Sequence, residues 1–198
     1  MELRFANCGD LRATGPRSIE GYAAVFDQTA DLGSYREVIR HGAFARCLRE
    51  KQDVRCLFNH DANNILGRTS AGTLNLAEDT TGLHFKCTLP DTRWGKDLRT
   101  LVRRGDVDGC SVSFTCLKDN WTQETKGGDS RNLRELLDLN LSDVGPVTYP
   151  AYTETSVSAR AEERGIILQP LSIGTYRGIS NDIERERLSL MLRLAVHI

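Results

Sequence analysis

Alternating apolar and polar residues predict several short β-strands along the first three quarters of the chain. In an alternating segment the apolar side chains share one face of the strand and the polar side chains share the other. The segments with this character are Asp53–Phe58, Thr73–Leu76, Leu83–Leu89, Gly109–Leu117 and Arg131–Val144. Ser18–Phe26, which is rich in small and aromatic residues, is a further predicted strand. The polar, glycine-containing stretch Lys118–Ser130 is expected to be an exposed loop, and Gly145-Pro146 is expected to break the last strand.

Two segments instead show helical spacing. Apolar residues recur at i, i+3 and i+4 in His41–Lys51, and a longer amphipathic pattern begins at Asp91 or Thr92 and ends at Gly105, a typical helix stop. Many short strands with few helices predict an α+β fold, with a mainly antiparallel β-barrel core flanked by a few helices. We assign residues 1–159 to this domain, 160–180 to a linker and 181–198 to a C-terminal amphipathic helix.

Composition excludes several classes of protein. The 198 residues are 39% hydrophobic and 27% charged, which is typical of a globular protein. The net charge of −1 provides no basic field for nucleic acid or an anionic membrane, and no apolar run is long enough to span a bilayer. Without a secretory signal or C-x-x-C spacing, the six cysteines are expected to be reduced and mostly buried, in a soluble intracellular protein.

One histidine stands out as a candidate general base. By parity His60 lies on the face of Val54, Cys56 and Phe58, at the point where that strand ends. An imidazole there would be partly desolvated and able to titrate near neutral pH. The alternative is a half-buried histidine with a purely structural hydrogen bond.

Two further polar features accompany it. Ser111, Ser113 and Thr115 form a hydroxyl face, which either faces solvent or supplies a nucleophile that an adjacent base activates. Asp143 continues the parity of an apolar strand, so its carboxylate either turns toward the core and needs a partner, or is turned to water by a bulge at Ser142.

The sequence lacks complete motifs for a metal site or a cofactor site. Cys56, His60 and Asp61 have metal-ligand character, but nothing nearby completes a zinc site. The sequence has no P-loop, no G-x-G-x-x-G and no G-x-S-x-G motif, so no metal and no cofactor are expected.

Five motifs in order carry a resemblance to a known family. They are E-G-Y-A-A-V-F, H-G-A-F-x-x-x-L, V-x-x-L-F-N-H-D followed by I-L-G, W-G-K-D-L with R-R-G-D-V-D-G-C-S-V-S-F, and D-V-G-P-V-T-Y-P-A-Y. Over roughly residues 18–152, the chain resembles the prohead maturation proteases of HK97-type tailed bacteriophages, which are relatives in fold of the herpesvirus assemblins.

The resemblance assigns roles to three residues. The N-H-D histidine maps to His60 as general base, the serine after D-G-C maps to Ser111 as nucleophile, and the late acidic residue maps to Asp143 as the third member. Ser113 stands where the family usually has glycine, so it is the alternative nucleophile. Asp143 replaces the commoner glutamate, and Gly145-Pro146 replaces a serine and an apolar residue.

The expected function follows from this resemblance. It implies a serine endopeptidase that matures phage procapsids in the cytoplasm of the bacterial host by cleaving the scaffolding region of the major capsid protein and itself. The portal protein and a second copy of the chain are further candidate partners. Backbone N–H groups, Arg131 or Arg134 would stabilise the oxyanion. The alternative is a non-catalytic capsid assembly or scaffold factor.

Overall fold

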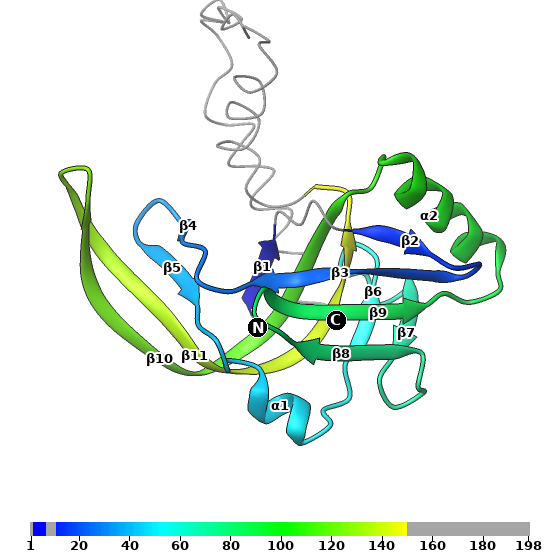
Figure 1. Cartoon of the computed structure of the whole chain (residues 1–198), viewed down its shortest axis with the longest axis horizontal. Helices are drawn as coiled ribbons and strands as arrows, with labels where there is room; N and C mark the ends of the chain where they lie inside the picture. The colour runs from blue at the N-terminus through cyan, green and yellow to red at the C-terminus, as the bar shows by residue number, and fades with distance from the viewer. Residues whose placement is uncertain (1, 7–10, 150–198) are drawn as a thin grey trace, which may run out of the picture. The chain divides into compact units, whose positions relative to one another are not determined.

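The computed structural model describes residues 2–6 and 11–149, which belong to one structural unit, Met1–Ser156 (Figure 1). The linker predicted at 160–180 and the helix predicted at 181–198 lie outside the described residues, as does Cys8.

The larger of two β-sheets is built around a long hairpin. Its strands follow the order β1-β10-β11-β5-β4, with β6 beside β11 and β7 beside β6. Strands β5 and β6 run parallel to β11, and the remaining pairs are antiparallel. The strands are β1 (Glu2–Ala6), β4 (Ala30–Asp31), β5 (Arg36–Ile39), β6 (Arg55–Leu57), β7 (Ile65–Arg68), β10 (Gly109–Lys126) and β11 (Asp129–Val147).

The smaller sheet is entirely antiparallel, in the order β2-β3-β9-β8. Its strands are β2 (Arg12–Thr14), β3 (Ser18–Val25), β8 (Leu74–Glu78) and β9 (Gly82–Thr88). The predicted α+β class, mainly β with few helices, is confirmed. The predicted barrel is wrong, because within residues 2–6 and 11–149 no strand of one sheet pairs with a strand of the other. Alternation identifies strands and their faces, but it does not say which strands hydrogen-bond to one another.

The polar stretch Lys118–Ser130 is not the predicted loop. It forms the outer halves of β10 and β11, joined at Gly127-Gly128, whose φ angles of 60° and 84° suit a tight hairpin turn (Figure 1). Apart from Trp121, the residues of this part of the hairpin are polar or glycine, so it lacks the alternation of a half-buried strand. Ion pairs such as that between Arg36 and Glu124 (3.2 Å) hold it to β5.

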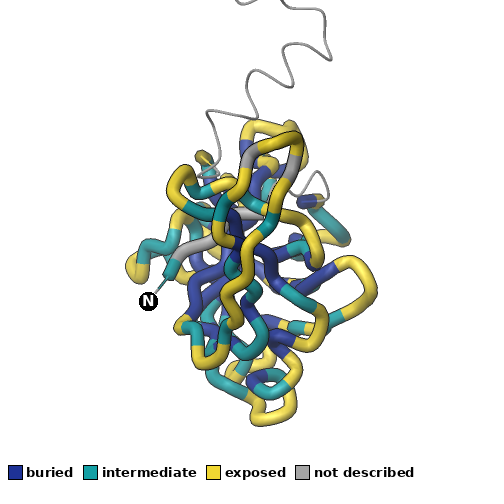
Figure 2. Tube along the Cα trace, turned by 90° about the vertical axis from the view of Figure 1, so that its left-hand side faces the viewer, coloured by how far each residue is buried: buried dark blue, intermediate teal, exposed yellow. Residues whose placement is uncertain are grey.

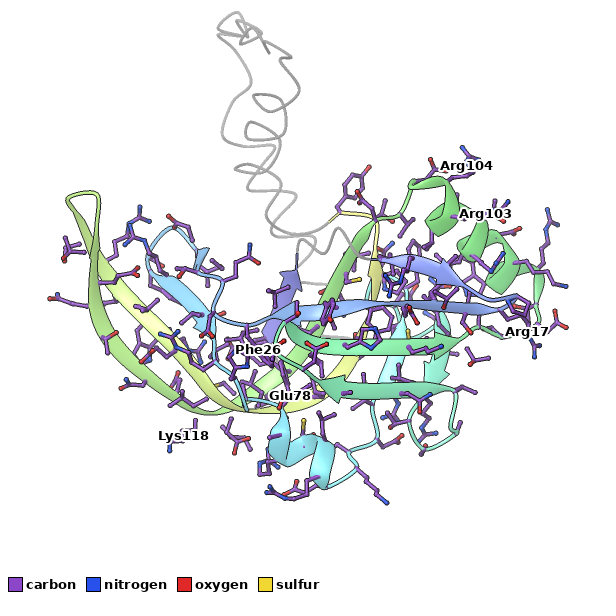
Figure 3. All side chains as sticks on the ribbon, in the orientation of Figure 1. Arg17, Phe26, Glu78, Arg103, Arg104 and Lys118 are labelled. Carbon is purple, nitrogen blue, oxygen red and sulfur yellow. The ribbon has the colours of Figure 1, made fainter. Side chains whose placement is uncertain are left out.

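Two helices complete the described structure. Helix α1 (Ala45–Arg49) is shorter than predicted, because Gly42 has a φ of 83° and the helix begins only after Phe44. The side chain of Glu78 accepts a hydrogen bond from the Phe44 N–H at 2.9 Å (Figure 3).

Helix α2 (Arg93–Arg104) confirms the second predicted helix. The Thr92 hydroxyl caps its beginning, and Gly105 in the left-handed conformation ends it. Arg103 and Arg104 lie in its last turn, where cations interact favourably with the helix dipole (Figure 3). No helix in the described part of the chain is long and apolar enough to cross a bilayer.

The core collects apolar side chains from both sheets and both helices, while the turns are exposed (Figure 2). Its largest completely buried side chains include Phe44, Phe85 and Phe114. Cys47, Cys56, Cys87 and Cys110 are buried free thiols, which confirms their predicted burial.

Candidate active site

Strands β10 and β11 place a serine and an aspartate on one face of the larger sheet. In their antiparallel ladder Ser111 lies opposite Gly145, and Ser113 lies opposite Asp143. A bulge does occur at Ser142, since Phe114 already pairs with Leu141. It does not turn Asp143 to water, because only 5% of Asp143 is exposed. Ser111 and Ser113 are also completely buried, so a solvent-facing hydroxyl face is wrong for both.

His60 comes from the turn that follows β6. Strand parity predicted that His60 lies on one face of this strand, at its end. Strand β6 in fact ends at Leu57, so His60 follows the strand and its position is not set by strand parity. Asn59 and His60 both have left-handed backbones, with φ angles of 54° and 56°. Such angles are uncommon outside glycine, and asparagine and histidine tolerate them better than most residues. Two consecutive left-handed residues, rather than an extended strand, set the direction of the imidazole.

Asn59 holds this turn against the end of β11. Its N–H donates to the carbonyl of Pro146 at 3.1 Å. Its side-chain carbonyl accepts from the N–H of Thr148 at 2.8 Å, and its amide group donates to the Thr148 hydroxyl at 3.2 Å. Three hydrogen bonds therefore tie the residue before His60 to Pro146 of β11 and to Thr148, which directly follows this strand.

The residue after His60 shapes the rest of the turn. The Asp61 carboxylate accepts hydrogen bonds from the N–H of Asn63 at 2.9 Å and from the side chain of Asn64 at 2.9 Å. On the other side, the ring of Phe58 contacts Trp94 of α2 edge-on, with centroids 5.5 Å apart. The N-H-D motif therefore has a local explanation in which the flanking residues fix the turn and His60 projects from it.

The three side chains form one hydrogen-bonded chain. Nδ1 of His60 lies 2.5 Å from Oδ1 of Asp143, and Nε2 lies 2.5 Å from Oγ of Ser111. A carboxylate only accepts hydrogen bonds, so Nδ1 carries the proton and Nε2 is left to accept the Ser111 hydroxyl proton. This tautomer is the one that a general base for Ser111 requires.

Burial strengthens these interactions. The side chains of His60 and Asp143 are only 11% and 7% exposed, and a charge-assisted hydrogen bond is stronger where water is excluded. Two buried thiols of the core do not compete as nucleophiles. Burial and a hydrogen bond with Cys87 raise the pKa of the Cys56 thiol well above its usual range. Burial likewise raises the pKa of Cys47 to about 11, so both thiols stay protonated at neutral pH.

Gly145 makes room for the main chain of β6. A Cβ atom at this position would lie 2.0 Å from the carbonyl oxygen of Leu57, so only glycine lets β6 approach β11 here. The sequence suggested that Gly145 breaks the strand, whereas β11 continues through it to Val147. Gly145 and Asn59 are the residues of the site whose roles sequence patterns did not reveal.

Two of the other histidines lie elsewhere. His41 pairs with Asp27 at 3.3 Å, and the His84 ring contacts Tyr22 at a centroid distance of 5.3 Å; His197 lies outside the described residues.

The arginines suggested as oxyanion donors are likewise occupied. Arg131 donates to Asp31 at 2.8 Å, and Arg134 to Glu2 at 2.6 Å. Arg134 is the nearer to Ser111 along the hairpin, yet it pairs with Trp121, about 30 Å along β10 from the serine. Neither arginine can therefore serve Ser111, and the suggestion is wrong for both. Backbone N–H groups stay the predicted oxyanion donors.

A buried serine, histidine and aspartate linked in this order define the class of site found in serine hydrolases with a Ser–His–Asp triad. Comparison with known families matches residues 8–167 to the caudovirus prohead serine proteases. The chain therefore belongs to this family.

A characterised relative supports the same assignment. The chain is 31% identical over 150 residues to the prohead protease of Enterobacteria phage HK97, a match that covers 74% of this chain and 61% of the relative. The chain thus spans about three fifths of the length of that relative. No solved structure matches significantly.

Proposed function

We propose that this chain is a serine endopeptidase that acts during procapsid maturation, with Ser111 as nucleophile, His60 as general base and Asp143 as the orienting acid. The observation that carries the proposal is the unbroken hydrogen-bonded path from Ser111 through His60 to Asp143. Ser111 is preferred over Ser113, because the hydroxyl of Ser113 has no hydrogen-bond partner among the described residues.

In the proposed reaction, Oγ of Ser111 attacks the scissile carbonyl as its proton passes to Nε2 of His60. Asp143 keeps the imidazole in the reactive tautomer and stabilises its charged form. The proton then moves from His60 to the leaving amine, which departs and leaves an ester on Ser111. Water, deprotonated by His60, hydrolyses that ester and restores the site.

The family and the relative's name support a substrate found in the prohead. We infer that the scaffolding region of the major capsid protein is cleaved, and that the chain also cleaves itself, inside procapsids assembling in the host cytoplasm. The portal protein and a second copy of the chain are proposed as further partners. We also propose that the two open sheets are a variant of the assemblin fold.

A fluorophosphonate probe tests the catalytic assignment. Oγ of Ser111 is expected to displace fluoride from the probe's phosphorus, and mass spectrometry of the full chain should locate the adduct on Ser111. Ser111→Ala should abolish labelling, while Ser130→Ala, at the exposed hairpin tip, should label normally. His60→Ala should label at least about 100-fold more slowly, and His84→Ala should label at the normal rate.

Co-expression with the capsid protein of the same phage tests the substrate. Wild type should shorten the capsid protein, and Ser111→Ala should leave it intact. If neither the probe nor the capsid protein reacts with wild type, a non-catalytic assembly factor is the better description.

A further inference from the structure

Four positions form a rectangle on the face of the sheet beneath His60. Ser111 and Ser113 lie two apart on β10, and their partners on β11 are Gly145 and Asp143. Residues two apart on a strand, and residues directly opposite in an antiparallel ladder, share a face. His60 spans the diagonal from Ser111 to Asp143. Gly145 leaves one remaining corner without a side chain, and Ser113 fills the other.

Ser113 and Asp143 each have unused hydrogen-bonding capacity. The Ser113 side chain is completely buried, and its hydroxyl has no partner among the described residues. Within the same residues Asp143 accepts one hydrogen bond, at Oδ1 from His60. A carboxylate can accept several hydrogen bonds, and a buried hydroxyl without a partner destabilises the fold. The Ser113 hydroxyl, which lacks a partner in the described part of the chain, and the Asp143 carboxylate, which can accept further hydrogen bonds, therefore face each other across the ladder.

The distance between the two residues suits a hydrogen bond. Directly opposite residues of an antiparallel pair have Cβ atoms about 4.5–5.5 Å apart. Rotation of the Ser113 side chain about χ1 carries its hydroxyl toward or away from the carboxylate. The contact is thus within reach of a rotamer change, with no movement of either strand.

We propose that Ser113 is a positioning residue, whose hydroxyl donates to the second oxygen of Asp143 when His60 becomes positively charged. This inference rests on the proposed function. Proton transfer from Ser111 turns the His60–Asp143 contact into an ion pair, and the carboxylate must then keep its orientation toward Nδ1. A donor on its other oxygen fixes that orientation, and Ser113 occupies the only directly opposite position on β10.

The two possible roles of Ser113 make different predictions for the labelling rate of Ser113→Ala. If Ser113 only fills space, alanine removes an unsatisfied hydroxyl, so the variant should be more stable by about 2–4 °C in Tm and fully active. If Ser113 positions Asp143, the variant should keep its Tm or gain stability, yet label with the fluorophosphonate probe about 10-fold more slowly. Ser113→Cys, with its weak S–H donor, should fall between wild type and Ser113→Ala.

A proton NMR signal tests the contact independently of labelling. The His60 Nδ1–H bonded to Asp143 should give a downfield resonance, assigned by its loss in His60→Ala. At a pH low enough to protonate His60, Ser113→Ala should shift this resonance, whereas Thr115→Ala, on the exposed part of the same strand, should not. An unshifted resonance together with wild-type labelling of Ser113→Ala overturns the inference. If the wild type itself does not label, the proposed function fails, and the resonance still decides whether Ser113 contacts Asp143.

Discussion

Gly145 lies directly opposite Ser111 in the ladder of β10 and β11, and the main chain of Leu57 occupies the space where a side chain would be. The absence of a Cβ atom is therefore what brings the His60 turn over the serine.

Gly145→Ala should separate β6 from β11. The added methyl group would lie 2.0 Å from the Leu57 carbonyl oxygen, so β6 must move and carry His60 with it. We expect probe labelling to fall by about 100-fold, because displacement of a catalytic group by 1 Å has an effect of that order. Gly127→Ala is the matched control: its new Cβ would meet no atom within 4 Å, and the strain from its φ of 60° arises at the hairpin turn and not at β6, so it should label normally. Normal labelling of Gly145→Ala would show that β6 can shift without moving His60.

Asn59→Gly should weaken the reaction without unfolding the protein. Glycine adopts the left-handed backbone of residue 59 readily, but it removes both side-chain hydrogen bonds to Thr148. We expect kcat to fall about 10-fold with little change in KM, because about 1.4 kcal/mol is within the net free energy of the two hydrogen bonds that are lost. Asn63→Gly, which removes an amide contact to Asp61 in the same loop, should keep its kcat. An equal fall in both variants would mean that general loop order, rather than the contact with Thr148, matters.

Arg134→Ala should be among the most destabilising surface-hairpin substitutions. Although burial opposes its charge, hydrogen bonds with Glu2 and Asp119 raise the pKa of Arg134. The guanidinium also lies 3.2 Å from Glu37, whose side chain is 2% exposed. Alanine would remove this ion pair, and breaking a buried ion pair by removing one partner typically costs about 3 kcal/mol. Chemical denaturation measures the change; Arg93→Ala, at a 96% exposed side chain, should change stability by less than about 0.5 kcal/mol.

Acid should weaken the contact between β7 and the segment before β6. Hydrogen bonds from Arg68 and Ser70 hold the pKa of Asp53 well below its usual range. A carboxyl group with a lowered folded-state pKa contributes stability above its unfolded pKa of about 3.9, and that contribution is lost as the pH falls through the folded value. Wild type should therefore lose more Tm than Asp53→Asn between pH 6 and pH 3. Parallel Tm curves for the two proteins would rule out this contribution.

Local sequence patterns predicted the parts of the fold that depend on local interactions. Thr92 and Gly105 marked the ends of α2 because capping is decided within one turn of the helix. The partner strands of β10, by contrast, were not visible in the pattern. Pairing depends on contacts between distant segments, and the polar outer hairpin is held by ion pairs that leave no alternation in the sequence.

The sequence predicted which side chains belong to the candidate site, but not the backbone geometry that brings them together. A carboxylate at a core-facing position and a histidine at the end of a strand each implied a partner, and the structure brings Asp143 and His60 together. The turn at Asn59 depends on backbone angles, and the close approach of β6 to β11 at Gly145 depends on main-chain distances. The pattern of apolar and polar side chains reveals neither.

Strand β11 also determines when the hydrogen-bonded chain of Ser111, His60 and Asp143 can form during synthesis. It supplies Asp143 and pairs with β10, the strand that carries Ser111. Its Pro146 carbonyl also accepts the hydrogen bond from the Asn59 N–H. A nascent chain that has emerged only as far as β10 holds a serine and a histidine with nothing to align them. Under the proposed function, translation must therefore pass residue 147 before Ser111, His60 and Asp143 can be aligned.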